Sequence, residues 1–127
     1  MKVVEVLKSK ESLIAGSGVD EATIKDAELK IGVTFSADYK EYLMAFGLAM
    51  YSGHEMTGLG KSKRTNVVDV TIHQKELNGN IDKMYVIEES NIDGIVIWQS
   101  SDGTVYATKG NSKPTKICDS LAQYIGE

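Results

Sequence analysis

The sequence predicts a single α+β domain in which helices pack on an antiparallel-rich sheet. Over residues 2–77 apolar side chains recur mostly at helical spacing, whereas residues 84–108 change to short runs rich in β-branched and aromatic residues. Helices, then strands, then a closing helix is an order typical of α+β folds. With 127 residues and no linker or repeat, we expect residues 1–127 to form one domain.

The first two helices are predicted from spacing and from their ends. Residues 2–14 place their apolar side chains near one helical face, and the glycine-rich turn at residues 16–18 ends this helix. A second helix is expected after Asp20, whose carboxylate can accept hydrogen bonds from free amides of the first turn. It should end at Gly32, because glycine readily adopts the left-handed conformation just past a helix.

A third helix is predicted from Ser36, its N-cap, to Gly47, which stops it. Its apolar and aromatic side chains recur three and four residues apart, as on a helix face that is turned toward a core. They are Tyr39, Tyr42, Leu43 and Phe46.

The middle of the chain gives weaker signals. Residues 49–65 are interrupted by glycines and predict short strands and loops. Asn66 resembles the cap of a fourth helix that runs to about Leu77, and residues 78–80 form a turn motif.

The last third predicts an antiparallel meander followed by a helix. The uninterrupted apolar run of residues 95–98 favours a central strand that is covered on both faces. Residues 115–117 predict a short edge strand, and Ser120 with Gln123 fits a capping box for the closing helix. The meander strands are expected at residues 84–90, 95–100 and 104–108, separated by the turn pairs Asp93-Gly94 and Asp102-Gly103.

Composition and charge exclude several classes of protein. The net charge of −4 argues against a non-specific nucleic-acid binder, which usually carries the opposite sign. No apolar run is long enough to span a bilayer, and the first residues do not resemble a signal peptide. The lone Cys118 cannot form an internal disulfide, which fits a reducing compartment. We therefore expect a cytoplasmic protein.

Charge is nevertheless distributed unevenly along the chain. Residues 61–75 carry four basic side chains against one acidic, whereas residues 82–102 carry five acidic side chains against one basic. Two solvated surfaces explain this pattern most simply. The alternative is an electrostatic field that steers a basic partner toward the acidic stretch.

Motifs for catalysis or metal binding are incomplete. The run at residues 58–62 resembles the end of a phosphate-binding loop, but Glu55 stands where that loop needs glycine. His54 and His73 have no supporting cysteine or carboxylate motif, so we expect no metal and no cofactor. Cys118 is more readily explained as a small buried residue than as a nucleophile.

Other candidate groups also have structural explanations. Glu88 and Glu89 are adjacent in a predicted strand, so they should point to opposite faces and cannot form an acid–base couple. Trp98 fits a core position better than an exposed interface anchor. We therefore predict that the protein is not an enzyme.

One series of positions recurs in a known group of proteins. The series comprises Ile24, Ala27-Glu28, Ile31-Gly32, Phe35, Asp38 to Leu43, Gly47 and Gly58-Leu59. With the later helix, strand and closing-helix positions, which agree as well, it resembles the SUKH superfamily across residues 20–125. This superfamily includes the yeast Smi/Knr cell-wall regulators and many bacterial immunity proteins. Phe35-Ser36 and Phe46-Gly47 depart from the usual Leu-Pro and Asn-Gly of this group.

The resemblance implies a SUKH-like domain that binds and neutralises a cognate polymorphic protein toxin, often a nuclease, without touching nucleic acid or membrane itself. An interaction scaffold in cell-wall or signalling regulation is the alternative that the eukaryotic members suggest. A nuclease must be basic where it holds phosphate, so carboxylates can engage it. We expect the partner to contact Glu55, Glu88, Glu89, Asp93 and Asp102.

Overall fold

The computed structural model describes residues 2–126, which form five helices and two antiparallel sheets. The α+β prediction is confirmed. The helices are α1 (Val3–Lys8), α2 (Glu21–Ile31), α3 (Ala37–Phe46), α4 (Val67–Leu77) and α5 (Leu121–Gly126). The strands are β1 (Ile14–Ala15), β2 (Ala49–Tyr51), β3 (His54–Glu55), β4 (Met84–Glu89), β5 (Ile95–Ser100), β6 (Val105–Lys109) and β7 (Thr115–Cys118).

The two sheets follow chain order and are joined at one point. The smaller sheet has the order β1-β2-β3, and the larger one has the order β4-β5-β6-β7, so the predicted meander and edge strand are confirmed. An antiparallel bridge joins Met56, the residue that follows β3, to Glu88 of β4. The amide of Thr57 also donates to the carbonyl of Ile87 at 2.9 Å. The residues after β3 are therefore fixed against β4.

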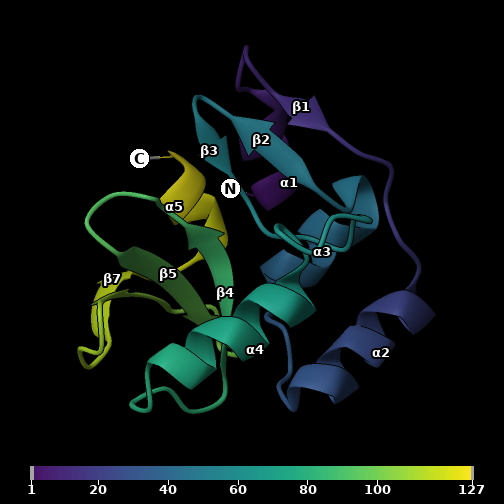
Figure 1. Ribbon diagram of the computed structural model, residues 1–127. Coiled ribbons are helices and arrows are strands. Elements are labelled where there is room, and N and C mark those ends of the chain that lie inside the picture. Colours follow the sequence, from purple (N-terminus) through teal and green to yellow (C-terminus); the bar gives the residue numbers. More distant parts are fainter. Residues whose placement is uncertain (1, 127) are drawn as a thin grey trace.

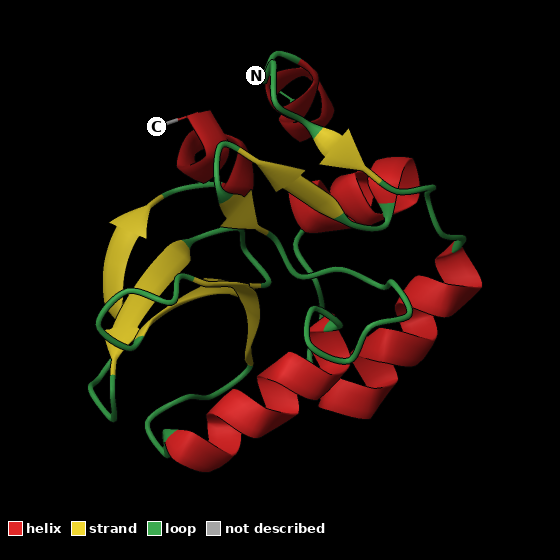
Figure 2. Ribbon diagram, turned by 45° about the horizontal axis from the view of Figure 1, so that its top comes forward, coloured by secondary structure: helices red, strands yellow, loops and turns green. Residues whose placement is uncertain are grey.

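Helices cover both faces of the larger sheet (Figure 1). On one face, Val70 of α4 packs with Val86 and Trp98 in a small apolar cluster. On the other face, Ile97 belongs to the main core, which also contains side chains from α1, α2, α3 and α5. The central strand β5 is thus covered on both sides, as its apolar run predicts. Figure 2 shows α2 lying alongside α4.

The predicted helix ends are confirmed by side-chain contacts. The Asp20 carboxylate accepts from the Thr23 amide at 2.9 Å, and the Ser36 hydroxyl accepts from the Tyr39 amide at 3.1 Å. The Asn66 side chain accepts from the Val68 amide at 2.9 Å. Each bond satisfies an amide that has no partner within its own helix. Gly32 adopts a left-handed φ of 77°, as a helix-ending glycine should.

The prediction of a helix over residues 2–14 is wrong in its length. The helix α1 ends at Lys8, and the Ser9 hydroxyl donates back to the Val6 carbonyl at 2.6 Å. Ile14 instead pairs with Met50 in the smaller sheet. Pairing with β2 satisfies backbone groups that a longer helix would have satisfied locally, so a contact distant in sequence overrides the helical spacing.

A polar network that the sequence did not predict connects α3, the larger sheet and α5. The Asp38 carboxylate accepts from the Leu121 amide at 2.7 Å and from the Gln99 side-chain amide at 3.1 Å. The Tyr85 hydroxyl accepts from the Ser36 amide at 2.9 Å and donates to Gln99 at 2.8 Å. This network fixes where the last helix begins.

Candidate partner-binding groove

The connection from β3 to α4 is held close to the end of α3, and glycine is required there. A Cβ atom on Gly58 would lie 2.0 Å from the carbonyl oxygen of Gly47, which leaves no room for any other residue. The next amide, of Leu59, donates to the same oxygen at 2.8 Å. The glycine run therefore has a structural cause, and it sets the path of the basic residues 61–64 that follow.

Two hollows lie side by side where this connection, α4 and the β4–β5 turn meet. Because Glu89 and Asn91 line both hollows, we treat them as one feature and call it the α4 groove. The smaller hollow, of about 90 Å³, is lined by Glu55, Met56, Thr57, Arg64, Thr65, Glu89 and Asn91. The larger, of about 330 Å³, is lined by Gln74, Leu77, Glu89, Asn91, Gly94, Ile95, Val96, Gly110 and Asn111.

One end of the α4 groove holds a charged pair. The Arg64 guanidinium donates to both carboxylate oxygens of Glu55, with Nη2 to Oε2 at 2.6 Å and Nη1 to Oε1 at 3.3 Å. The hydrogen bonds from Arg64 lower the pKa of Glu55, and the same bonds raise the pKa of Arg64. The negative charge of Glu89 adds to the rise in the pKa of Arg64. The three side chains therefore share one electrostatic environment.

Glu89 lies in the middle of the α4 groove and is half-buried. Its carboxylate accepts from the side-chain amide of Gln74 at 2.5 Å. Among residues 2–126, no lysine, arginine or histidine nitrogen lies within the 4.0 Å of an ion pair with it. With Glu55 paired to Arg64, the charge of Glu89 has no direct counter-charge.

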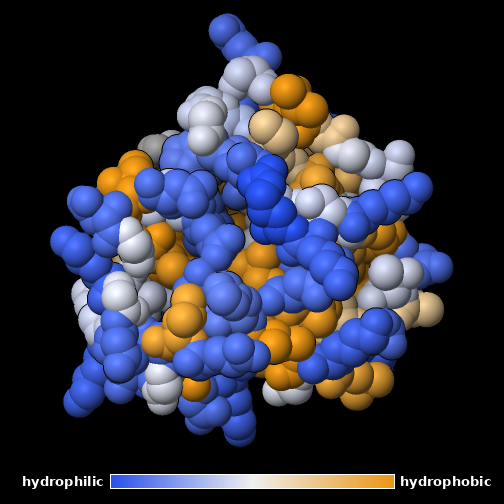
Figure 3. Space-filling view, in the orientation of Figure 1, coloured by the Kyte–Doolittle hydropathy of each residue, from blue (hydrophilic) through white to orange (hydrophobic). Residues whose placement is uncertain are grey.

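The other end of the α4 groove is apolar. Leu77 is 58% exposed at the end of α4, and it lines the larger hollow together with Ile95 and Val96. Figure 3 shows this face of the molecule, where apolar surface is exposed over α4 and the neighbouring strands between hydrophilic side chains. Asp93 lies in the β4–β5 turn beside Gly94, is exposed, and has a left-handed φ of 52°.

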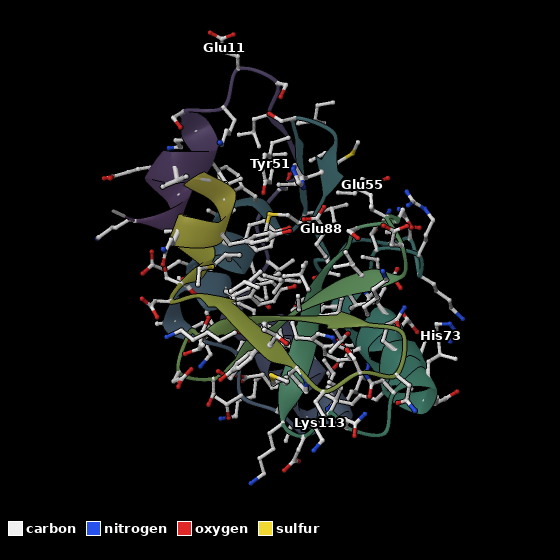
Figure 4. The ribbon with its side chains drawn as sticks, turned by 90° about the vertical axis from the view of Figure 1, so that its left-hand side faces the viewer. Glu11, Tyr51, Glu55, His73, Glu88 and Lys113 are labelled. Atoms are coloured by element: carbon white, nitrogen blue, oxygen red, sulfur yellow. The ribbon has the colours of Figure 1, made fainter. Side chains whose placement is uncertain are left out.

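Glu88 points away from the α4 groove into the molecule. Its side chain is only 5% exposed, and it accepts from the Tyr124 hydroxyl at 2.5 Å. The ring nitrogen Nδ1 of His54 lies 2.8 Å from the same carboxylate. Figure 4 shows Glu88 beneath the β2–β3 hairpin near Tyr51, with Glu55 on the outer side. The expectation that Glu88 and Glu89 occupy opposite faces of their strand is confirmed.

Asp102 lies at the opposite end of β5 from Asp93, because the turns on the two sides of one strand cannot meet. It is exposed and accepts from the Thr104 amide at 2.9 Å, and hydrogen bonds from Ser100 and Thr104 lower its pKa. Of the five carboxylates expected to contact a partner, the structure thus brings Glu55 and Glu89 to one hollow and places Asp93 in the turn that borders the α4 groove. Their contact with a partner stays a prediction.

Sequence reasoning missed the contributions of Arg64, Gln74 and Leu77 to this groove. From the sequence alone, the basic stretch at residues 61–75 and the acidic stretch at residues 82–102 are most simply explained as two solvated surfaces, with electrostatic steering of a basic partner as the alternative. The structure brings one member of each, Arg64 and Glu89, to the same hollow. The opposite charges of the two stretches are the signal in the sequence that could have suggested that Arg64 and Glu89 lie near each other.

The remaining reactive side chains are dispersed. Cys118 is buried in β7 and Trp98 is fully buried under α4, as expected of core residues. His73 lies on α4, apart from Glu88 (Figure 4). Within residues 2–126, no three histidine, cysteine, aspartate or glutamate side chains are grouped so that they could hold a metal ion. None of the described helices is both long and apolar enough to cross a membrane.

Comparison with known proteins identifies the family to which the sequence is similar. A family described as SMI1-KNR4 cell-wall matches the chain over residues 1–127. No curated protein matches it significantly.

Proposed function

Because this chain belongs to the SMI1-KNR4 cell-wall family of the SUKH superfamily, we propose that it is an immunity protein that neutralises a cognate polymorphic toxin in the cytoplasm. It acts by forming a stoichiometric complex that covers the active site of the toxin or a surface beside it. This role requires no turnover, no metal and no cofactor from the protein. The nucleic acid, where the toxin is a nuclease, is contacted by the toxin alone.

The observation that carries this proposal is the carboxylate of Glu89, which has no ion pair among residues 2–126, beside the Glu55–Arg64 pair. A nuclease domain presents basic side chains where it holds phosphate. A half-buried acidic group in an open groove is complementary to such a surface, and complementary charge raises association rates and selects partners. Asp93, exposed in the adjoining turn, extends the same negative character.

The test is co-expression with the carboxy-terminal domain of the protein encoded by the adjacent upstream gene. Cells that express this domain alone should stop growing, and cells that also express the wild-type chain should grow. Glu89→Lys should abolish the rescue, because it places a positive charge against a basic partner. Glu11→Lys is the matched control, because Glu11 is exposed at the far tip of the molecule (Figure 4).

A second role, as an interaction scaffold in cell-wall or signalling regulation, is supported by the cell-wall description of the matching family. Deleting the gene would then sensitise cells to cell-wall stress even when no toxin gene is present. Sensitivity that appears only together with a toxin gene argues for the immunity role.

A further inference from the structure

The α4 groove combines two kinds of surface that one short segment of a partner could cover together. Glu55, Arg64 and Glu89 together carry one net negative charge. Among residues 2–126, Glu89 is the member of this group without an ion pair. A half-buried charge is stabilised when an opposite charge reaches it. A lysine or arginine side chain from outside would supply that charge.

The apolar end of the groove is complementary to an aliphatic side chain. Leu77 exposes 58% of its surface, and Ile92 exposes 63% in the β4–β5 turn that borders the groove. Covering this area with an aliphatic side chain would remove apolar surface from water on both partners. Glu89 lines both hollows, so the sites for the basic and the aliphatic group adjoin each other.

Arg64 already occupies the charged end in the free protein. Its side chain is 68% exposed, and its only ion pair among the described residues is with Glu55. Exposed ion pairs are weak, so the Glu55–Arg64 pair can rearrange at little cost when a partner binds. We propose that the α4 groove binds a protein segment carrying a basic side chain next to an aliphatic one. The basic side chain pairs with Glu89, and Arg64 is the cation that competes with it for the carboxylates of the groove.

This inference rests on the proposed function, because it specifies the chemistry of the toxin segment that the same groove would bind. A nucleic acid does not fit, since its phosphates would meet Glu89 without a counter-charge. A second copy of the chain is the other possible occupant, and the experiment below separates it from a distinct partner.

The experiment uses the full chain, labelled with ¹⁵N, and a panel of synthetic peptides in which arginine and leucine are separated by one to three glycines. Matched peptides carry glutamate in place of arginine or serine in place of leucine. Amide shifts in two-dimensional NMR report where each peptide binds. Perturbations are expected at Glu89, Asn91 and Gly94, and only from peptides with both groups.

Variants then test each part of the groove. Glu89→Gln keeps the size of the side chain and should weaken binding about three- to tenfold, and Leu77→Ser should weaken it similarly. Arg64→Ala should tighten binding about two- to fivefold, because the competing guanidinium is gone. Glu11→Gln should change nothing. Thermal melts of each variant establish that it folds.

Four outcomes would overturn the inference: no peptide binds at millimolar concentration, the glutamate peptides bind equally well, Arg64→Ala weakens binding, or sedimentation shows that a second copy fills the groove. Rescue in the co-expression test without any peptide binding removes this inference and leaves the immunity proposal. Peptide binding by a chain that rescues cells from no toxin domain removes the immunity proposal and leaves the binding chemistry of the groove.

Discussion

The carboxylate of Asp38 accepts hydrogen bonds from two elements other than its own, through the Leu121 amide and the Gln99 side chain. Two more residues of the series that resembles the SUKH superfamily also form hydrogen bonds with residues outside their own helices. Glu28 accepts from the Phe35 amide at 2.8 Å, and the Tyr39 hydroxyl lies 2.7 Å from that of Thr57. The residues that identify the family here thus hold the fold, and none of these three lines the α4 groove.

Replacing Asp38 by asparagine should destabilise the protein by about 2 kcal/mol, because one of two N–H donors would then face an amide that also donates. Urea denaturation measures the free energy of unfolding. Asp26→Asn is the control, because among the described residues Asp26 forms an exposed ion pair with Lys30 and no other ion pair. This substitution should change stability by less than about 0.5 kcal/mol. Equal losses in the two variants would contradict the importance of the network.

At the scale of elements, the connection between β3 and α4 depends on the close approach of two backbone segments at Gly58. Gly58→Ala should cost about 3 kcal/mol or more, because the Cβ atom would collide with a backbone carbonyl that cannot move aside easily. Gly79→Ala is the matched control, since its Cβ would meet nothing within 4 Å. Thermal unfolding compares the two, and similar melting temperatures would show that the connection can shift.

The beginning of α2 should respond to acid. The hydrogen bonds from Thr23 lower the pKa of Asp20 in the folded protein. The contribution of this cap to stability is therefore complete above the unfolded pKa of about 4, and it is lost as the pH falls through the lower folded pKa. Urea denaturation between pH 6 and pH 2 should give a flatter profile for Asp20→Asn than for the wild type. Parallel profiles would exclude this role.

Elements defined by local chemistry were predicted well from the sequence. Caps such as Asp20, Ser36 and Asn66, and the turns between the last strands, depend on neighbours within a few residues. The end of α1 was not predicted, because Ile14 leaves the helical pattern to pair with Met50, far along the chain. The Asp38 network was missed for the same reason, since its partners lie in β5 and α5.

The whole molecule has an aromatic centre that should make it sensitive to alkali. Tyr39, Tyr42 and Tyr85 are buried, and burial is the main cause that raises the pKa of each phenol. In the unfolded chain they ionise near pH 10. Because the folded state keeps their protons longer, stability is fully present below that pH and falls as the pH rises above it.

Absorbance at 295 nm and circular dichroism, recorded together between pH 9 and pH 13, test this expectation. Ionisation of the buried tyrosines should coincide with the loss of secondary structure in one cooperative step. Full ionisation of all tyrosines while the circular dichroism stays native would contradict it.

The distribution of charge over the whole molecule gives a prediction for association with the toxin. Raising the salt concentration should slow association markedly and change dissociation less, because screening acts mainly on long-range attraction. Surface plasmon resonance at several salt concentrations measures both rates. Asp102→Lys, at the other end of β5, shows whether the contact extends beyond the α4 groove. An association rate that is indifferent to salt would exclude electrostatic steering.

The candidate site was predictable only in part. Its acidic members could be named from the sequence because charge is visible there, but which of them meet depends on the path of the chain. Side chains alternate between the two faces of β4, which separates Glu88 from Glu89. The connection between β3 and α4, which is held against the end of α3 at Gly58, brings Arg64 to Glu55. No local pattern indicates that second contact, because it joins a loop to a strand across the groove.

The position of α5 has a consequence for partial unfolding. Leu121 and Ile125 belong to the main core, and the start of their helix is fixed by Asp38 of α3. Detaching this short helix would expose apolar surface and remove one donor from the Asp38 carboxylate. The two helices should therefore open together, and their amides should exchange hydrogen with the solvent as one cooperative unit.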